Sequence, residues 1–114
     1  MKSITSLLLL AATFVAAQDE GDKPIVLDHS NFYGNVMDQE TKTVIGDKPW
    51  FVKFYSPNCG HCVKMAPTWD ELHLSSKAKA NVAKVDCKAT ENRPLCKDFD
   101  VKGYPSLLLF ANDG

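Results

Sequence analysis

The sequence has no excess of charge of one sign and no basic stripe. Its formal net charge is −1, with 13 lysine and arginine residues against 14 aspartate and glutamate residues, interleaved along the chain. Nucleic-acid-binding domains usually carry clustered lysine and arginine, so a nucleic-acid partner is not expected. Internal repeats and low-complexity segments are also lacking, and the 114 residues fit a single domain.

A run of apolar residues long enough to cross a membrane is absent as well. The apolar residues 7–12 follow Lys2 and precede the small residues 15–17, and the run is shorter than the ~20 residues of a spanning helix. This pattern predicts a secretory signal peptide over residues 1–17, cut after Ala17. We therefore expect one domain over residues 18–114, with no membrane span, in an oxidising compartment.

Strand and helix patterns alternate along the rest of the chain and predict an α/β domain. Residues 50–56 are rich in aromatic and β-branched side chains, as in a central strand covered on both faces. From Cys59 apolar residues recur every three or four positions, which predicts a helix that Pro67 should kink. The other expected elements are strands 25–27, 43–45, 81–87 and 106–110 and helices 28–36 and 91–100.

Cys59 and Cys62 are separated by two residues, Gly60 and His61, where strand 50–56 gives way to a helix. A thiol attacks a disulfide as its thiolate, and the free N–H groups and dipole of a helix start stabilise that anion. His61 can add to the stabilisation. These features favour an exposed nucleophile at Cys59 and a more buried resolving thiol at Cys62.

Other uses of the pair fit the sequence less well. A haem attachment site needs histidine directly after the second cysteine, where Val63 stands. A zinc site needs two more ligands, and the spacing of Cys87 and Cys96 does not form a second short knuckle. A purely structural disulfide would close a loop too short to constrain much chain entropy. Redox cycling is the favoured interpretation.

Three motifs stand in a specific order: "FVKFYSPNCGHCVKMAPTWDEL", "NVAKVDC" and "VKGYPSLLLF". Together they resemble a catalytic thioredoxin-fold domain of the protein disulfide isomerase family, over residues 24–114. The resemblance implies a thioredoxin-like α/β fold, with a central mixed sheet flanked by helices. It implies chemistry by the cysteines themselves, so neither a cofactor nor a metal is expected.

The resemblance also implies roles for the matched positions. Cys59 would form the mixed disulfide with the substrate, and Cys62 would resolve it. His61 would stabilise the thiolate, which makes the pair a better disulfide donor. Pro105 matches the cis-proline of the family, which lies against the cysteines and lends the backbone of Tyr104 to the substrate.

The sequence departs from the family pattern in three respects, two of them beside the cysteines and one at the end of the given sequence. Asn58 stands where the family usually has tryptophan. Lys53 stands where many members bury a glutamate that takes the proton of the resolving cysteine. A lysine at such a position can extend its ammonium group to water. The chain also stops at an Asp-Gly turn after strand 106–110. We therefore expect a domain that lacks its last strand and helix, as in a truncated sequence.

The remaining cysteines and histidines have less specific surroundings. In an oxidising compartment a structural disulfide between Cys87 and Cys96 is favoured over two separate thiols, and some family members carry a comparable pair. A second redox centre is disfavoured because neither cysteine lies at an exposed helix start. His29 and His73 are expected at the surface, because neither has a matching ligand or nucleophile nearby in the sequence.

The sequence thus predicts a thiol–disulfide oxidoreductase of the endoplasmic reticulum lumen. It would act on unfolded or misoxidised secretory proteins, with glutathione or an oxidase as redox partner. One alternative is a chaperone-like module that binds unfolded chains without turnover. Another is a fragment that does not fold independently.

Overall fold

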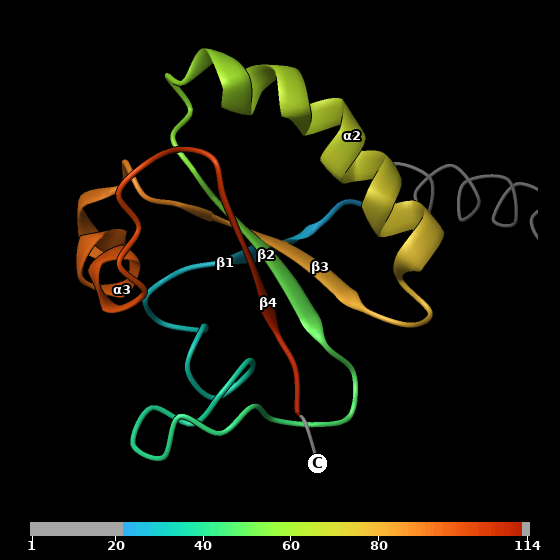
Figure 1. The fold of residues 1–114 in the computed structure, drawn as a ribbon, viewed down its shortest axis with the longest axis vertical. Helices are drawn as coiled ribbons and strands as arrows, with labels where there is room; N and C mark the ends of the chain where they lie inside the picture. Colours follow the sequence, from blue (N-terminus) through green and yellow to red (C-terminus); the bar gives the residue numbers. More distant parts are fainter. Residues whose placement is uncertain (1–21, 113–114) are drawn as a thin grey trace, which may run out of the picture.

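The computed structural model describes residues 22–112 (Figure 1). The predicted leader, residues 1–17, and the Asp-Gly turn at residues 113–114 lie outside this range. The described chain forms, in order, strand β1 (Ile25–Leu27), strand β2 (Trp50–Tyr55), helix α2 (Gly60–Ser76), strand β3 (Asn81–Asp86), the 3₁₀ turn η1 (Thr90–Asn92), helix α3 (Arg93–Asp98) and strand β4 (Ser106–Phe110).

The four strands form one mixed sheet in the order β1-β3-β2-β4. β3 runs parallel to both of its neighbours, and β4 runs antiparallel to β2. Two parallel strands need a crossover connection, which α2 supplies between β2 and β3. The predicted α/β class with a mixed sheet is confirmed, and β2 has a strand on each side, as its apolar sequence indicated.

The core lies on the face of the sheet that α3 covers. Val52 and Phe54 of β2 are fully buried there, and Leu95 of α3 packs in the same cluster. The Phe99 ring, just after α3, lies 5.9 Å from the Phe54 ring and 5.1 Å from the Phe110 ring. Burial of these large rings stabilises the attachment of α3 to the sheet.

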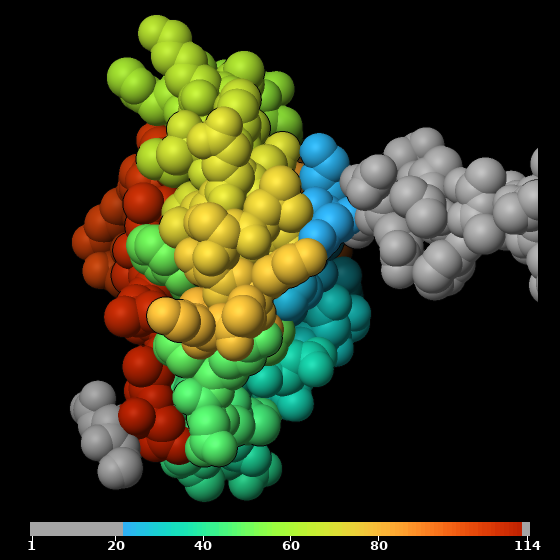
Figure 2. Space-filling view, turned by 90° about the vertical axis from the view of Figure 1, so that its right-hand side faces the viewer, coloured from blue at the N-terminus to red at the C-terminus, as the bar shows by residue number. Residues whose placement is uncertain are grey.

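The opposite face of the sheet is covered by α2. Successive residues of a strand point to opposite faces, so Phe51 and Lys53 point away from α3. The Trp69 ring of α2 lies 4.9 Å from the Phe51 ring, and its Nε1–H donates to the Ala83 carbonyl oxygen at 2.9 Å. Figure 2 shows α2 from its outer side, between the β1 segment and the β4 segment.

α2 continues through Pro67 to Ser76 as one helix of 17 residues, and its ribbon bends along its length (Figure 1). The strands expected over 50–56 and 81–87 each end one residue earlier, at Tyr55 and Asp86. Among the described residues, no helix has both the length and the apolar character needed to cross a membrane.

The helix expected over residues 28–36 is wrong. The segment forms turns instead, in which Asp28 Oδ1 accepts the backbone N–H groups of Ser30 at 2.8 Å and Asn31 at 3.1 Å. Such side-chain bonds compete with the helical ones. Gly34 then adopts a φ of 98°, which a right-handed helix does not allow.

The short strand expected over residues 43–45 is also wrong, because only an isolated bridge joins Val44 to Met37. Asp38 turns the chain just before it: its Oδ1 accepts the N–H groups of Glu40 and Thr41 at 2.9 Å. Polar turns of this kind leave too few residues extended for a ladder.

Candidate active site

The cysteine pair lies at the junction of β2 and α2. Cys59 is the N-cap residue of α2, and its Sγ accepts the N–H of Cys62 at 3.4 Å. The N–H of Cys59 itself donates to the Ser56 carbonyl oxygen at 3.1 Å. A thiolate at an N-cap receives donors that the first turn of a helix leaves free, so this position favours the anion.

The two thiols differ in exposure and in acidity. Cys59 is half-buried and Cys62 is 3% exposed. Hydrogen bonds from the Cys62 thiol, the Cys62 N–H and the His61 N–H lower the pKa of Cys59. Burial raises the pKa of Cys62. The pair thus combines an accessible thiol that ionises readily with a buried one that resists ionisation.

The loop before β4 faces Cys59. The Tyr104–Pro105 peptide bond is cis, and the Tyr104 carbonyl oxygen accepts a hydrogen bond from Cys59 Sγ at 3.5 Å. The Tyr104 side chain is 42% exposed. The fold therefore brings together Cys59, Cys62, Tyr104 and Pro105, although 45 positions separate the first from the third. His61 is exposed and contributes its backbone N–H.

Lys53 lies behind Cys62. It is 3% exposed, and together with Cys62 and Lys84 it lines a cavity of about 190 Å³. Its Nζ lies 5.3 Å from the centre of the Tyr55 ring and 5.7 Å from that of Trp69. Burial and the charge of Lys84 lower the pKa of Lys53, while the Cys62 and Asp70 charges act in the other direction. The amino group is thus held among rings rather than extended to water.

Cys87 and Cys96 form a disulfide between the residue after β3 and helix α3, with Cα atoms 6.0 Å apart. Both residues are buried in the core. This is the pairing that the family resemblance implies. In the described part of the chain, no three histidine, cysteine, aspartate or glutamate side chains gather into a group that could hold a metal ion.

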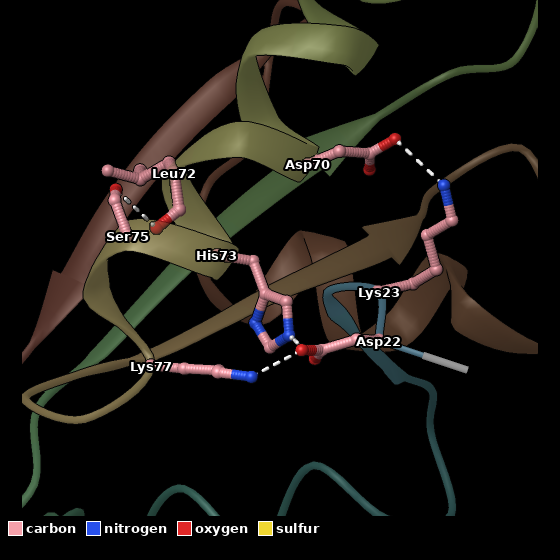
Figure 3. A network of polar contacts seen from close by, with 7 residues as sticks. All are labelled: Asp22, Lys23, Asp70, Leu72, His73, Ser75 and Lys77. Atoms are coloured by element: carbon pink, nitrogen blue, oxygen red, sulfur yellow. Dashed lines mark hydrogen bonds and ion pairs between the residues drawn. The ribbon is translucent and has the colours of Figure 1, made fainter. Parts of the chain in front are cut away.

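The surface position expected for His73 is wrong, whereas His29 is exposed as predicted. His73 is 8% exposed, and its Nε2 lies 2.6 Å from Asp22 Oδ1 (Figure 3). Lys77 binds the other carboxylate oxygen of Asp22. The sequence held one signal: His73 follows Trp69 by four positions and so shares its buried helical face. No sequence signal indicated that Asp22, 51 positions away, would be its partner.

A redox-type cysteine pair at a helix start, facing an X-Pro loop on a mixed sheet, is the arrangement of a thiol–disulfide exchange domain. The thioredoxin family model matches residues 23–114. The chain belongs to the thioredoxin family, and the predicted likeness to the protein disulfide isomerases is confirmed by its relatives.

Protein disulfide-isomerase 1 of Dictyostelium discoideum is 40% identical over 113 residues, which cover 96% of this chain and 29% of that protein. A thioredoxin domain-containing protein of Theileria parva is 42% identical over 105 residues, 92% of this chain and 46% of that one. The chain thus spans less than half the length of these relatives.

Solved structures share the fold. The J-Trx1 fragment of ERdj5 aligns with a TM-score of 0.66 at 32% identity, over 84% of this chain and 43% of that one. Thioredoxin f from spinach chloroplast has the same TM-score at 24% identity, over 79% and 73% of the two chains. The thioredoxin-like fold is confirmed, and the relatives support activity of the thiol–disulfide oxidoreductase kind.

Proposed function

We propose that the protein is a thiol–disulfide oxidoreductase of the protein disulfide isomerase type, with Cys59 as nucleophile and Cys62 as resolving thiol. The observation that carries the proposal is the opposite shift of the two thiols at one helix start: the pKa of Cys59 is lowered and that of Cys62 is raised. The exposed thiol thus forms the attacking thiolate more readily than the buried one does, which favours Cys59 as the first nucleophile.

The reaction has two exchange steps. The Cys59 thiolate attacks one sulfur of a substrate disulfide, so a Cys59–substrate bond forms, the substrate bond breaks, and the second substrate sulfur leaves as a thiolate that takes up a proton. Cys62 then gives up its proton and attacks Cys59 Sγ. The Cys59–Cys62 disulfide forms and the first substrate sulfur is released, so the substrate gains the two electrons that the pair loses.

The same steps in reverse donate a disulfide to a substrate. If another cysteine of the substrate attacks the mixed disulfide before Cys62 does, Cys59 is released and the substrate disulfide is isomerised. The Tyr104 carbonyl oxygen and cis-Pro105 lie where the substrate backbone would pass, since that oxygen is 3.5 Å from the attacking sulfur. Gly60 and His61 fill the turn between the two thiols and present the His61 N–H to Cys59.

The proposed setting is the endoplasmic reticulum lumen, with unfolded or misoxidised secretory proteins as substrates and glutathione or an oxidase as redox partner. The predicted leader and the similarity to protein disulfide isomerases support this setting. An oxidising compartment is also where the Cys87–Cys96 disulfide would persist.

The test is reduction of insulin by the protein with excess glutathione, and refolding of a scrambled disulfide protein. We expect both activities in the parent chain and neither in the Cys59→Ser variant. Cys87→Ala/Cys96→Ala, which removes the other two cysteines and keeps Cys59 and Cys62, is the matched control, assayed where circular dichroism shows that it is folded. Activity that survives the loss of Cys59 would disprove the mechanism.

A module that binds unfolded chains without turnover is the second candidate. Burial of Lys53 beside Cys62 favours it, because no described carboxylate hydrogen-bonds to that lysine to relay a proton. This candidate requires a Cys59 thiol of ordinary reactivity. Slow alkylation of Cys59 at mildly acidic pH would support the binding module, and rapid alkylation would exclude it.

A further inference from the structure

A large basic cavity opens beside the active site. Its volume is about 560 Å³, and its lining includes the four basic residues Lys88, Arg93, Lys97 and Lys102. We call this hollow, with its four basic residues, the basic cavity. Arg93 and Lys97 belong to α3, and Lys88 directly follows Cys87 after β3. The Cys87–Cys96 disulfide therefore joins the segments that carry these three side chains. The four cations thus come from one stretch of the chain, residues 88–102, which α3 and the disulfide fold around the hollow.

The positive charge of the basic cavity is largely uncompensated. Asp100 is the one acidic residue in its lining, and it pairs with Lys102 at 3.6 Å, where both side chains are about four-fifths exposed. Among residues 22–112, Lys88, Arg93 and Lys97 make no ion pair. A hollow with a net positive lining in a chain of formal charge −1 attracts negative groups more strongly than the rest of the surface does.

The basic cavity reaches the reacting sulfur through two residues. Ser56 and Tyr104 belong to its lining. The Ser56 carbonyl oxygen accepts the N–H of Cys59 at 3.1 Å, and the Tyr104 carbonyl oxygen lies 3.5 Å from Cys59 Sγ. A chain whose cysteine is bonded to Cys59 would therefore have its neighbouring side chains at the edge of this hollow.

We propose that the basic cavity is a specificity site for acidic side chains that flank the reacting cysteine of a polypeptide substrate. The inference rests on the proposed function, since it concerns the substrate of the same cysteine. Carboxylates entering the hollow would pair with cations that lack partners in the described chain. Encounter would also be faster, because the field draws the negative segment toward Cys59.

The test compares three peptides that contain the same disulfide and differ in two flanking residues, which are glutamate, glutamine or lysine. The rate of reduction by the protein is followed at low and at high ionic strength. At low ionic strength we expect the glutamate peptide to react about three- to tenfold faster than the glutamine peptide, and the lysine peptide to react slowest. High salt should remove the difference.

Two variants with equal charge change assign the effect to the cavity. Arg93→Gln/Lys97→Gln, which removes two cations that lack partners in the described chain, should abolish most of the preference and leave the rate with the glutamine peptide unchanged. Lys48→Gln/Lys79→Gln removes two exposed lysines outside the lining and should keep the preference. Equal loss in both variants would show a general charge effect and overturn the proposal.

Other results separate this proposal from the proposed function. If the glutamine peptide is reduced but glutamate confers no advantage, the specificity site is wrong and the oxidoreductase stands. If no peptide is reduced, both fail. A cysteine-free acidic peptide should inhibit reduction of the glutamate peptide. A single-stranded oligonucleotide that inhibits at lower concentration would assign the cavity to phosphate groups and overturn the proposal.

Discussion

Cys59 and Cys62 stand three positions apart at the start of α2, yet their thiols lie in different surroundings. Cys59 faces the Tyr104 loop and receives the N–H of Cys62, whereas Cys62 is 3% exposed and points toward the cavity of Lys53. Because hydrogen bonds stabilise one anion and burial destabilises the other, the two thiols can act in a fixed order.

The first prediction concerns the acidity of Cys59. The rate of alkylation by iodoacetamide, followed against pH, should rise with an apparent pKa below the ordinary value of 9.0. Cys62→Ala removes the thiol that hydrogen-bonds to Cys59 and should move this midpoint upward. An unchanged midpoint in the variant would show that the Cys62 thiol does not stabilise the Cys59 thiolate.

The second prediction concerns Lys53. Lys53→Met replaces a buried amino group by an apolar side chain of similar length and should raise the free energy of unfolding by about 1 kcal/mol at neutral pH. The pKa of Lys53 in the folded state lies below 10.5. The cost of burying its charge therefore lowers the free energy of unfolding in full below that lowered pKa, and this cost disappears as the pH rises to 10.5. Urea denaturation of both proteins over this pH range measures the gain.

The same variant should slow the second exchange step. The Lys53 charge favours the Cys62 thiolate, so its loss should prolong the life of the mixed disulfide, as measured by quenched-flow mass spectrometry. Lys84→Met is the matched control from the facing strand. A variant that is less stable and equally fast would contradict this account of Lys53.

Sequence reasoning located Cys59, Cys62 and Lys53 because motif spacing fixes their positions on adjacent elements. It did not place His73, because burial of that residue depends on Asp22, which is 51 positions away and lies before β1. The basic cavity was likewise hidden: its lysines and arginine lie within residues 88–102, but the hollow also needs Ser56 and Tyr104, which join it only when α3 folds against the sheet.

At the scale of elements, α3 is attached to β3 by the Cys87–Cys96 disulfide and by the rings around Phe99. The third prediction follows from the short loop that the disulfide closes, since Cys87 and Cys96 are nine positions apart. Cys87→Ala/Cys96→Ala should lower the free energy of unfolding by about 2–3 kcal/mol.

Urea denaturation of the parent chain and the double variant measures this loss. The pH dependence of Cys59 alkylation should be the same in the folded double variant as in the parent chain. A loss near zero would show that core packing alone fixes α3. A changed profile would show that the disulfide also supports the active site.

The segment before β1 is attached to the far end of α2 by Asp22, which binds His73 and Lys77 (Figure 3). The fourth prediction is that Asp22→Asn lowers the melting temperature near neutral pH. Hydrogen bonds from Lys77 and His73 hold the pKa of Asp22 below 3.8. Its stabilisation is therefore present above 3.8 and is lost as the pH falls through the lowered value.

Thermal melts of both proteins from acidic to neutral pH test this link. The difference in melting temperature should vanish at the acidic end. A difference that is constant with pH would assign the effect to packing rather than to the carboxylate charge.

Element prediction succeeded where apolar spacing was regular and failed where side chains bond to their own backbone. β2, α2 and β4 follow directly from periodicity. The expected helix over 28–36 has apolar residues at helical spacing, but Asp28 and Gly34 direct the chain into turns. Local bonds of this kind win in short segments because a helix of two turns gains little from propagation.

At the scale of the molecule, the proposed active site is assembled from both halves of the chain. β2 and α2 present the cysteines, and the loop before β4 brings Tyr104 to Cys59. The class of the fold could be predicted from alternating elements. The strand order β1-β3-β2-β4 could not, because strand pairing depends on contacts between residues distant in the sequence.

The most direct measurement is capture of the mixed disulfide. The Cys62→Ser variant, which cannot complete the second step, is mixed with an oxidised peptide and analysed by mass spectrometry after tryptic digestion. We predict a covalent peptide adduct on Cys59, which reductant removes, and none in Cys59→Ser. A Cys62→Ser protein that forms no adduct on Cys59, while remaining folded, would contradict the account.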